Sequence, residues 1–205
     1  MQRPLSRIIM CAALVASAAV SAVAQGDPRP SAAVAVEQNA AAWKKLAPAG
    51  SGFTALMPGT ASEQTAPVKS ARGDLQNHLF TLETPLAAYI VSYVEFPEPV
   101  TDPETIKRML DGGRDSGLSS ASATLRSERE IKIDGHPGRE WVMGVQGKFV
   151  AHARAYWVKQ RLYQALIIME DAPANASAAT LKLREDTVAK FLNSFALADE
   201  AAATR

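Results

Sequence analysis

The stretch that decides the fold runs from Ile131 to Glu170 and reads IKIDGHPGREWVMGVQGKFVAHARAYWVKQRLYQALIIME. Runs rich in β-branched and aromatic residues alternate with short turn signals around Gly135, Gly147 and Lys159. Such a succession is typical of consecutive antiparallel strands. The stretch is therefore predicted to form the centre of one sheet, and it carries no recognisable catalytic motif.

Further strands are predicted upstream of this stretch. They cover residues 53–57, 60–70, 74–83 and 86–96. The polar run 60–70 contains Pro67, which is compatible only with an edge strand or a bulge. The last two form a hairpin about Thr84 and Pro85. Apolar side chains fall on both faces of the second, which predicts layers above and below the sheet or a strand at its centre.

One helix is predicted just before the quoted stretch. Thr101 is the expected N-cap, with Pro103 in the first turn and Glu104 at the capping-box position. Gly112 and Gly113 are expected to stop or weaken the helix after about three turns, since each costs about 1 kcal/mol relative to alanine. Residues 116–123 are then interpreted as a loop rich in small residues.

A second helix is predicted after the stretch, from the helical spacing of its apolar residues. These residues are Leu181, Val188, Phe191, Leu192 and Phe195. Asn175 or Ser177 can cap this helix. Residues 43–46 are interpreted as a short helical turn, with the Trp43 indole as a core anchor.

Residues 1–24 have the pattern of a secretory signal peptide. Arg3 and Arg7 precede an uncharged, alanine-rich run, and Ala22-Val23-Ala24 matches a signal peptidase site. The alternatives are a retained membrane anchor, for which the run is short, and lipidation at Cys11, which lies too early in the apolar run. Cleavage is the prediction, with a periplasmic or secreted mature protein that has no membrane span.

After such a cleavage, residues 25–42 form a flexible N-terminal segment and residues 43–198 a single domain. Cys11 is the only cysteine of the 205 residues, so the mature chain would have no disulfide or thiol chemistry. Of 22 Lys and Arg, two precede residue 25, which leaves 20 against 21 Asp and Glu. A near-neutral chain with interspersed charges has no basic patch of the kind that binds nucleic acid, so no nucleic-acid partner is predicted.

The order of motifs across residues 43–197 resembles the PsbP/Mog1-like superfamily, in particular its small exported bacterial members of unknown function. The resemblance lies in W-x-x-L before FTALMPGT, in GHPGRE, in R-x-Y-W-V and RLYQA, and in VAKFLNSF near the end. It implies an α/β fold in which an antiparallel sheet is flanked by helices, an α/β/α sandwich. It also implies a binding or assembly module and no enzyme.

Three polar side chains form a candidate ligand surface on the 148–159 strand. His152, Arg154 and Tyr156 alternate along it and so project from one face, while Phe149 to Trp157 at odd positions occupy the other. One reading is a polar ligand site. The other is a face that is partly solvated or covered by a loop, so that the three residues have a structural role. The structural role is the preferred interpretation.

The remaining polar motifs are interpreted structurally. His136 belongs to a turn with Gly135 and Gly138, and His78 stands alone in a strand, so no metal or cofactor site is predicted. Arg139 and Glu140 are neighbours in a strand and point to opposite faces, so each is expected to pair with another residue. No nucleophile elbow, penicillin-binding signature or phosphate loop is present.

The sequence therefore favours an exported, non-catalytic domain that binds an envelope or periplasmic protein, or serves as an assembly factor. The alternative is a carrier or sensor of a small apolar ligand held between sheet and helix, for which the alanines between Phe149 and Trp157 could leave room. A hydrolase without recognisable motifs is the third hypothesis. A carrier needs an internal cavity of roughly 300 Å³ or more, whereas a protein-binding module needs an exposed apolar patch.

Overall fold

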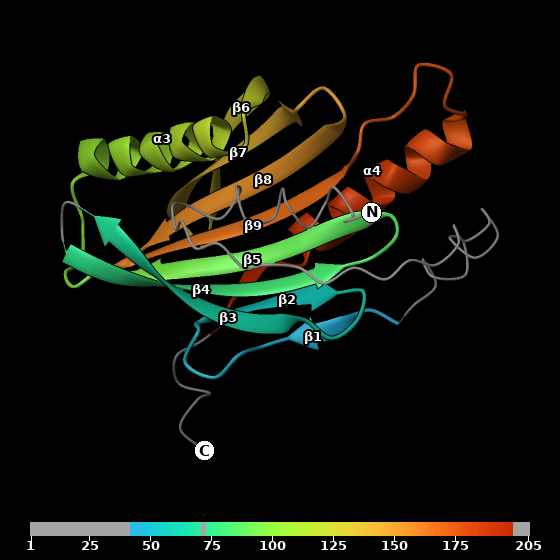
Figure 1. Ribbon diagram of the computed structural model, residues 1–205. Coiled ribbons are helices and arrows are strands. Elements are labelled where there is room, and N and C mark those ends of the chain that lie inside the picture. Colours follow the sequence, from blue (N-terminus) through green and yellow to red (C-terminus); the bar gives the residue numbers. More distant parts are fainter. Residues whose placement is uncertain (1–41, 71–72, 199–205) are drawn as a thin grey trace.

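In the computed structural model, the structure describes residues 42–70 and 73–198 (Figure 1). The predicted signal peptide and residues 25–41 of the predicted flexible segment lie outside the described residues. The domain predicted from Trp43 onward lies within them, apart from Ala71 and Arg72.

The described chain forms two helices and ten strands. In chain order these are β1 (Lys44–Leu46), β2 (Phe53–Met57), β3 (Ser62–Ser70), β4 (Gly73–Glu83), β5 (Ala87–Glu95), α3 (Pro103–Ser120), β6 (Ala123–Ile133), β7 (His136–Val145), β8 (Phe149–Val158), β9 (Arg161–Glu170), α4 (Ala178–Asn193) and β10 (Ala196–Leu197). Seven strands pair in the order β3-β4-β5-β9-β8-β7-β6, and a smaller sheet has the order β1-β2-β10. All pairings are antiparallel, which confirms a mixed α/β chain that is mostly sheet.

The large sheet buries both of its faces (Figure 1). Side chains that include Trp141 and Trp157 pack with Leu110 of α3 on one face. On the other face, Tyr89 and Ile167 pack with Phe191 of α4 and with the small sheet. Strand β5 is buried on both sides along nearly its whole length, as its apolar pattern predicts.

The predicted centre of the sheet needs one correction. Strand β9 is the middle strand and pairs with β5, which comes from far upstream in the chain. The stretch from Ile131 to Glu170 therefore begins at the β6 edge and reaches the centre only at its end. Strand β3, which contains Pro67, is the opposite edge, as predicted.

Helix α3 differs from its prediction at both ends. Asp102 is the N-cap in place of Thr101, and its carboxylate accepts a hydrogen bond from the Thr105 amide at 2.8 Å. The helix also continues through Gly112 and Gly113 to Ser120, across most of the predicted loop. Burial of Ile106 and Leu110 against the sheet outweighs the low helix propensity of the two glycines.

Residues 44–46 are a strand, so the predicted helical turn there is wrong. Lys44 to Leu46 pair with Ala55 to Met57 of β2. Trp43 lies edge-on to Tyr89 at 5.9 Å, and the Lys190 ammonium lies 4.7 Å from the centre of its ring. The indole thus attaches the start of the domain to α4, as a core anchor does.

Helix α4 is buried only over its C-terminal half. Ser177 is the N-cap, and its hydroxyl accepts from the Thr180 amide at 3.1 Å. Phe191 and Leu192 are buried, but Leu181 remains 41% exposed although its spacing places it on the predicted apolar face. The first turns of α4 therefore do not pack closely on the sheet.

Candidate functional site

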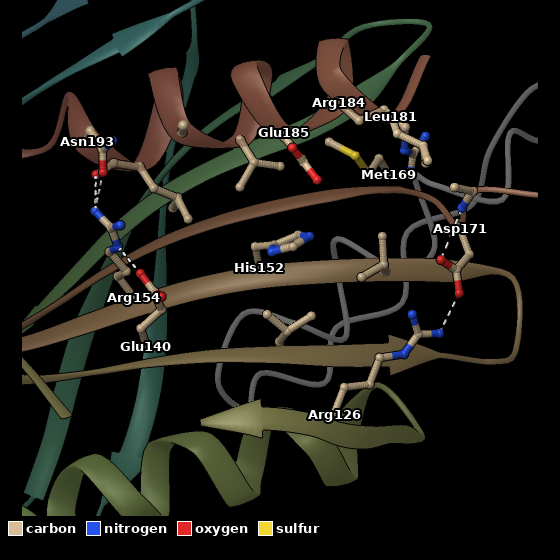
Figure 2. A pocket seen from close by; sticks show the side chains of 16 residues that line it. Arg126, Glu140, His152, Arg154, Met169, Asp171, Leu181, Arg184, Glu185 and Asn193 are labelled. Carbon is tan, nitrogen blue, oxygen red and sulfur yellow. Dashed lines mark hydrogen bonds and ion pairs between the residues drawn. The ribbon is translucent and has the colours of Figure 1, made fainter. Parts of the chain in front are cut away.

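A groove of about 450 Å³ lies between α4, from Leu181 to Asn193, and the sheet (Figure 2). We call it the α4 groove. Its walls come from β6 to β9, from the residues after β9 and from α4. The lining residues are Arg126, Glu140, Val142, Val150, His152, Arg154, Met169, Asp171, Ala172, Leu181, Arg184, Glu185, Val188, Ala189, Leu192 and Asn193.

The groove exists because α4 is fastened at its C-terminal end. The Phe191 ring contacts Tyr89 edge-on at 5.2 Å, and the Leu56 amide donates to the Ser194 hydroxyl at 2.8 Å. Between Ala178 and Asp186, no side chain of α4 is buried. Helix α4 thus covers this part of the sheet and is held in place by contacts at its C-terminal end. We call its groove-lining side the roof of the groove.

His152 occupies the floor of the groove. It points from β8 toward the α4 side, between the strands that carry Val142 and Ile167. Within residues 42–70 and 73–198, no hydrogen bond or ion pair involves its ring. Burial lowers the pKa of His152 below its ordinary value, Arg184 and Arg126 lower it further, and Glu140 opposes them. The imidazole is therefore uncharged at neutral pH.

One end of the groove is closed by a charged cluster. The Arg154 guanidinium donates to the Glu140 carboxylate at 2.5 Å and to the Asn193 side-chain oxygen and the Leu192 carbonyl of α4 at 2.9 and 3.1 Å. Arg129 donates to the other Glu140 oxygen at 2.6 Å. Burial alone would raise the pKa of Glu140, but the hydrogen bonds from the two arginines outweigh it and hold that pKa below its usual value.

The other end of the groove depends on a β-bulge at Arg126. The register of β6 against β7 shifts between Leu125 and Ser127, so Arg126 turns to the α4 side. Its guanidinium lies over Gly144, where an added Cβ would come within 2.8 Å of Nε. It forms an ion pair with Asp171, and Arg184 of α4 donates to the Glu170 carbonyl nearby.

The structure brings together two of the three residues predicted as a ligand surface. His152 and Arg154 line the α4 groove, but Tyr156 does not. Its side chain is only 5% exposed and stacks on Phe195 with ring centres 5.6 Å apart. Burial raises the pKa of its phenol. Tyr156 is therefore a core residue, since β10 and the end of α4 cover that part of the strand.

The alanine face of β8, where the carrier hypothesis placed room for an apolar ligand, is filled. Ala151, Ala153 and Ala155 are buried in the core beneath α3, where two large side chains, Trp141 and Trp157, fill the space. The groove is instead on the face that carries His152 and Arg154. Sequence reasoning also missed Arg126, Asp171 and the lining residues of α4. One signal for the α4 side was present in the sequence, because the apolar face predicted for this helix includes Leu181, which the structure leaves 41% exposed.

The paired groups of the sheet behave as predicted for Arg139 and Glu140. Arg139 forms ion pairs with Asp111 at 2.8 Å and Glu128 at 3.2 Å on the α3 side. Glu140 pairs with Arg154 on the opposite side. In the part of the chain that the structure describes, no three His, Cys, Asp or Glu side chains lie together so as to hold a metal ion.

The lowered pKa of the buried His152 imidazole predicts that the stability of the protein depends on pH. Below pH 6.5 the unfolded chain takes up a proton on this residue before the native chain does, because the native pKa is lower. The free energy of unfolding therefore falls with decreasing pH in this window and is unaffected by His152 above it. In urea unfolding between about pH 7.5 and about pH 5, His152→Leu should show a smaller fall than the wild type. An equal fall in both proteins would contradict the burial of an uncharged imidazole.

Comparisons with known proteins give little guidance. No family model matches the sequence, and no curated protein matches it. A solved structure with some similarity is the immunity protein TplEi of T6SS from Pseudomonas aeruginosa, complexed with "L" peptide. Its TM-score is 0.34 at 15% identity, and the match covers 84% of this chain and 64% of that chain. So weak a likeness carries no argument about this chain.

Over the described ranges, neither helix is long and apolar enough to cross a membrane.

Proposed function

We propose that this chain is a non-catalytic binding domain that holds a small, largely apolar ligand in the α4 groove. The observation that carries the proposal is the groove itself. Its volume of about 450 Å³ lies in the range of small-molecule sites. Apolar atoms make up most of its exposed lining, although half of its sixteen lining residues are charged or polar. A mostly apolar lining with polar groups that orient the ligand is usual for such a site.

The groove supports a ligand carrier better than a catalyst. The arginines and carboxylates at its two ends pair with one another, which satisfies their charges. His152 has no hydroxyl or carboxylate hydrogen-bonded to it in the described chain, so it lacks the contact that makes a nucleophile–base pair. These contacts favour binding without chemistry.

A protein partner is the second candidate. Two large apolar side chains of α4, Leu181 and Leu183, are 41% and 40% exposed. Leu181 lines the groove, so a partner could insert a side chain there. This proposal includes a partner in the envelope or periplasm. It also includes export directed by the signal-peptide pattern of residues 1–24, and membership of the PsbP/Mog1-like superfamily with its sandwich fold. The sequence patterns support them.

Filling the groove tests the function directly. Ala189 lines the groove from α4 and is exposed, so Ala189→Trp places an indole in the groove with no change in the core. The probe is the uncharged dye N-phenyl-1-naphthylamine, which fluoresces strongly in apolar sites. We expect the full wild-type chain to bind it and Ala189→Trp to weaken the affinity by about tenfold or more.

Ala179→Trp is the matched control. Ala179 is an exposed residue in the first turn of the same helix and does not line the groove. This variant should bind the dye like the wild type. Equal affinity in all three proteins, or no dye binding by the wild type, would reject the α4 groove as the binding site.

A further inference from the structure

The charges of the α4 groove define its ligand further. We propose that the ligand is an uncharged amphipathic molecule, whose hydroxyl or carboxamide group lies between His152 and Glu185 and whose apolar body follows the aliphatic lining. This inference rests on the proposed function, because it concerns the same site.

The apolar part of the site is continuous from floor to roof. Val142, Val150 and Met169 form the floor on three adjacent strands. The roof consists of α4 side chains, namely Leu181, Val188, Ala189 and Leu192. An alkyl or aromatic body placed between them gains affinity in proportion to the apolar surface that it removes from water. This area contributes affinity without selecting a head group.

Two of the three arginines that line the groove are already paired with carboxylates. Arg154 already donates to Glu140 and Asn193, and Arg126 is paired with Asp171. Arg184 donates to the Glu170 carbonyl. An anion at Arg154 or Arg126 would have to displace a carboxylate, and an anion at Arg184 would meet the carboxylate of the neighbouring Glu185. Desolvating a charge without a new partner is costly, so anions are disfavoured.

A cationic head group is opposed by the floor of the groove. Burial is the main reason that the pKa of the His152 imidazole is lowered; Glu140 and Asp171 oppose this effect, and Arg184 and Arg126 add to it. A ligand ammonium at that place would meet the same burial and the same charges of both signs. The one carboxylate of the groove that is unpaired within the described residues, Glu185, is exposed to solvent, where an ion pair contributes little. The lining holds three arginines and three carboxylates in all, so it offers no net charge of either sign.

Two polar side chains remain to orient a ligand. His152 and Glu185 have no hydrogen-bond or ion-pair partner among the residues that the structure describes. Figure 2 shows Glu185 projecting from α4 toward the strand that carries His152. A carboxylate only accepts hydrogen bonds, whereas an uncharged imidazole can accept one and donate one. A hydroxyl or carboxamide both donates and accepts, and so satisfies both side chains.

Three ligands with the same ten-carbon tail separate these possibilities. Decan-1-ol, decanoate and decylammonium are titrated against bound N-phenyl-1-naphthylamine on the full chain at about pH 7.5, where His152 is uncharged. We expect decan-1-ol to displace the dye at concentrations about tenfold lower than either ion. His152→Leu should weaken decan-1-ol about three- to tenfold, the effect of one hydrogen bond. His78→Leu, a matched change on β4 outside the groove, should not.

The outcomes distinguish this inference from the proposed function. If decanoate or decylammonium competes as well as decan-1-ol, or if His152→Leu leaves decan-1-ol unchanged, the uncharged head group is wrong. The groove remains the site in that case, provided that Ala189→Trp still weakens all binding. If the dye does not bind, or Ala189→Trp has no effect, the proposed function fails and this inference fails with it.

Discussion

Phe191→Ala is expected to lower the free energy of unfolding by about 3–5 kcal/mol, the usual cost of truncating a buried phenylalanine. Phe191 is 0% exposed and packs in the core between α4 and the large sheet, edge-on to Tyr89. It holds the C-terminal end of α4 against the sheet, and it therefore sets the distance between α4 and the sheet across the groove. Urea unfolding at constant pH measures the change, and dye affinity should fall in the same variant.

Leu183→Ala is the control for this prediction. Leu183 lies on the same helix but is 40% exposed, so its truncation should change stability by no more than about 0.5 kcal/mol. If the two variants lose similar free energy, or if Phe191→Ala loses less than about 1.5 kcal/mol, then α4 is not held by this contact.

Gly138→Ala is expected to destabilise the protein by about 3 kcal/mol, at the upper end of the range for overpacked sites. A Cβ at this position would lie 2.5 Å from the Ala155 carbonyl oxygen and 2.5 Å from Cδ1 of Tyr156. The first of these atoms belongs to the backbone of β8, which pairs with β7 at Tyr156 and Gly138. The two strands would have to separate locally, and Tyr156 would move off Phe195.

Gly112→Ala should raise the free energy of unfolding, whereas Gly138→Ala lowers it. Gly112 lies inside α3, and a Cβ there meets nothing within 4 Å. Alanine at such a position is expected to stabilise the helix by up to about 1 kcal/mol. Thermal or urea unfolding of the two variants side by side checks both values. A loss at Gly112, or a neutral Gly138→Ala, would contradict the packing described for these strands.

Much of the fold follows from local patterns in the sequence. The alternation of FTALM predicts β2, Thr84-Pro85 marks the turn between β4 and β5, and Ser177 caps α4 as its residue type suggests. These features depend on residues close together in the chain. Gly112 and Gly113 show the limit of this reasoning, since their low propensity is overcome by packing that sequence cannot display.

The candidate site was less predictable for a physical reason. Alternation along β8 correctly places His152 and Arg154 on one face, but it cannot tell that β10 and α4 cover Tyr156 and leave His152 open to a groove. The bulge at Arg126 reverses the face expected from strict alternation in β6. The depth of the groove depends on where α4 is fastened, which is a property of tertiary contacts between distant segments.

The central claim is that the α4 groove is the binding site, and methyl NMR of the full chain with bound N-phenyl-1-naphthylamine tests it most directly. We predict intermolecular nuclear Overhauser effects from the dye to the methyl groups of Val142, Val150 and Val188, which line the groove from two strands and from α4. Effects confined to Leu86 or Leu125, exposed side chains outside the groove, would contradict the claim.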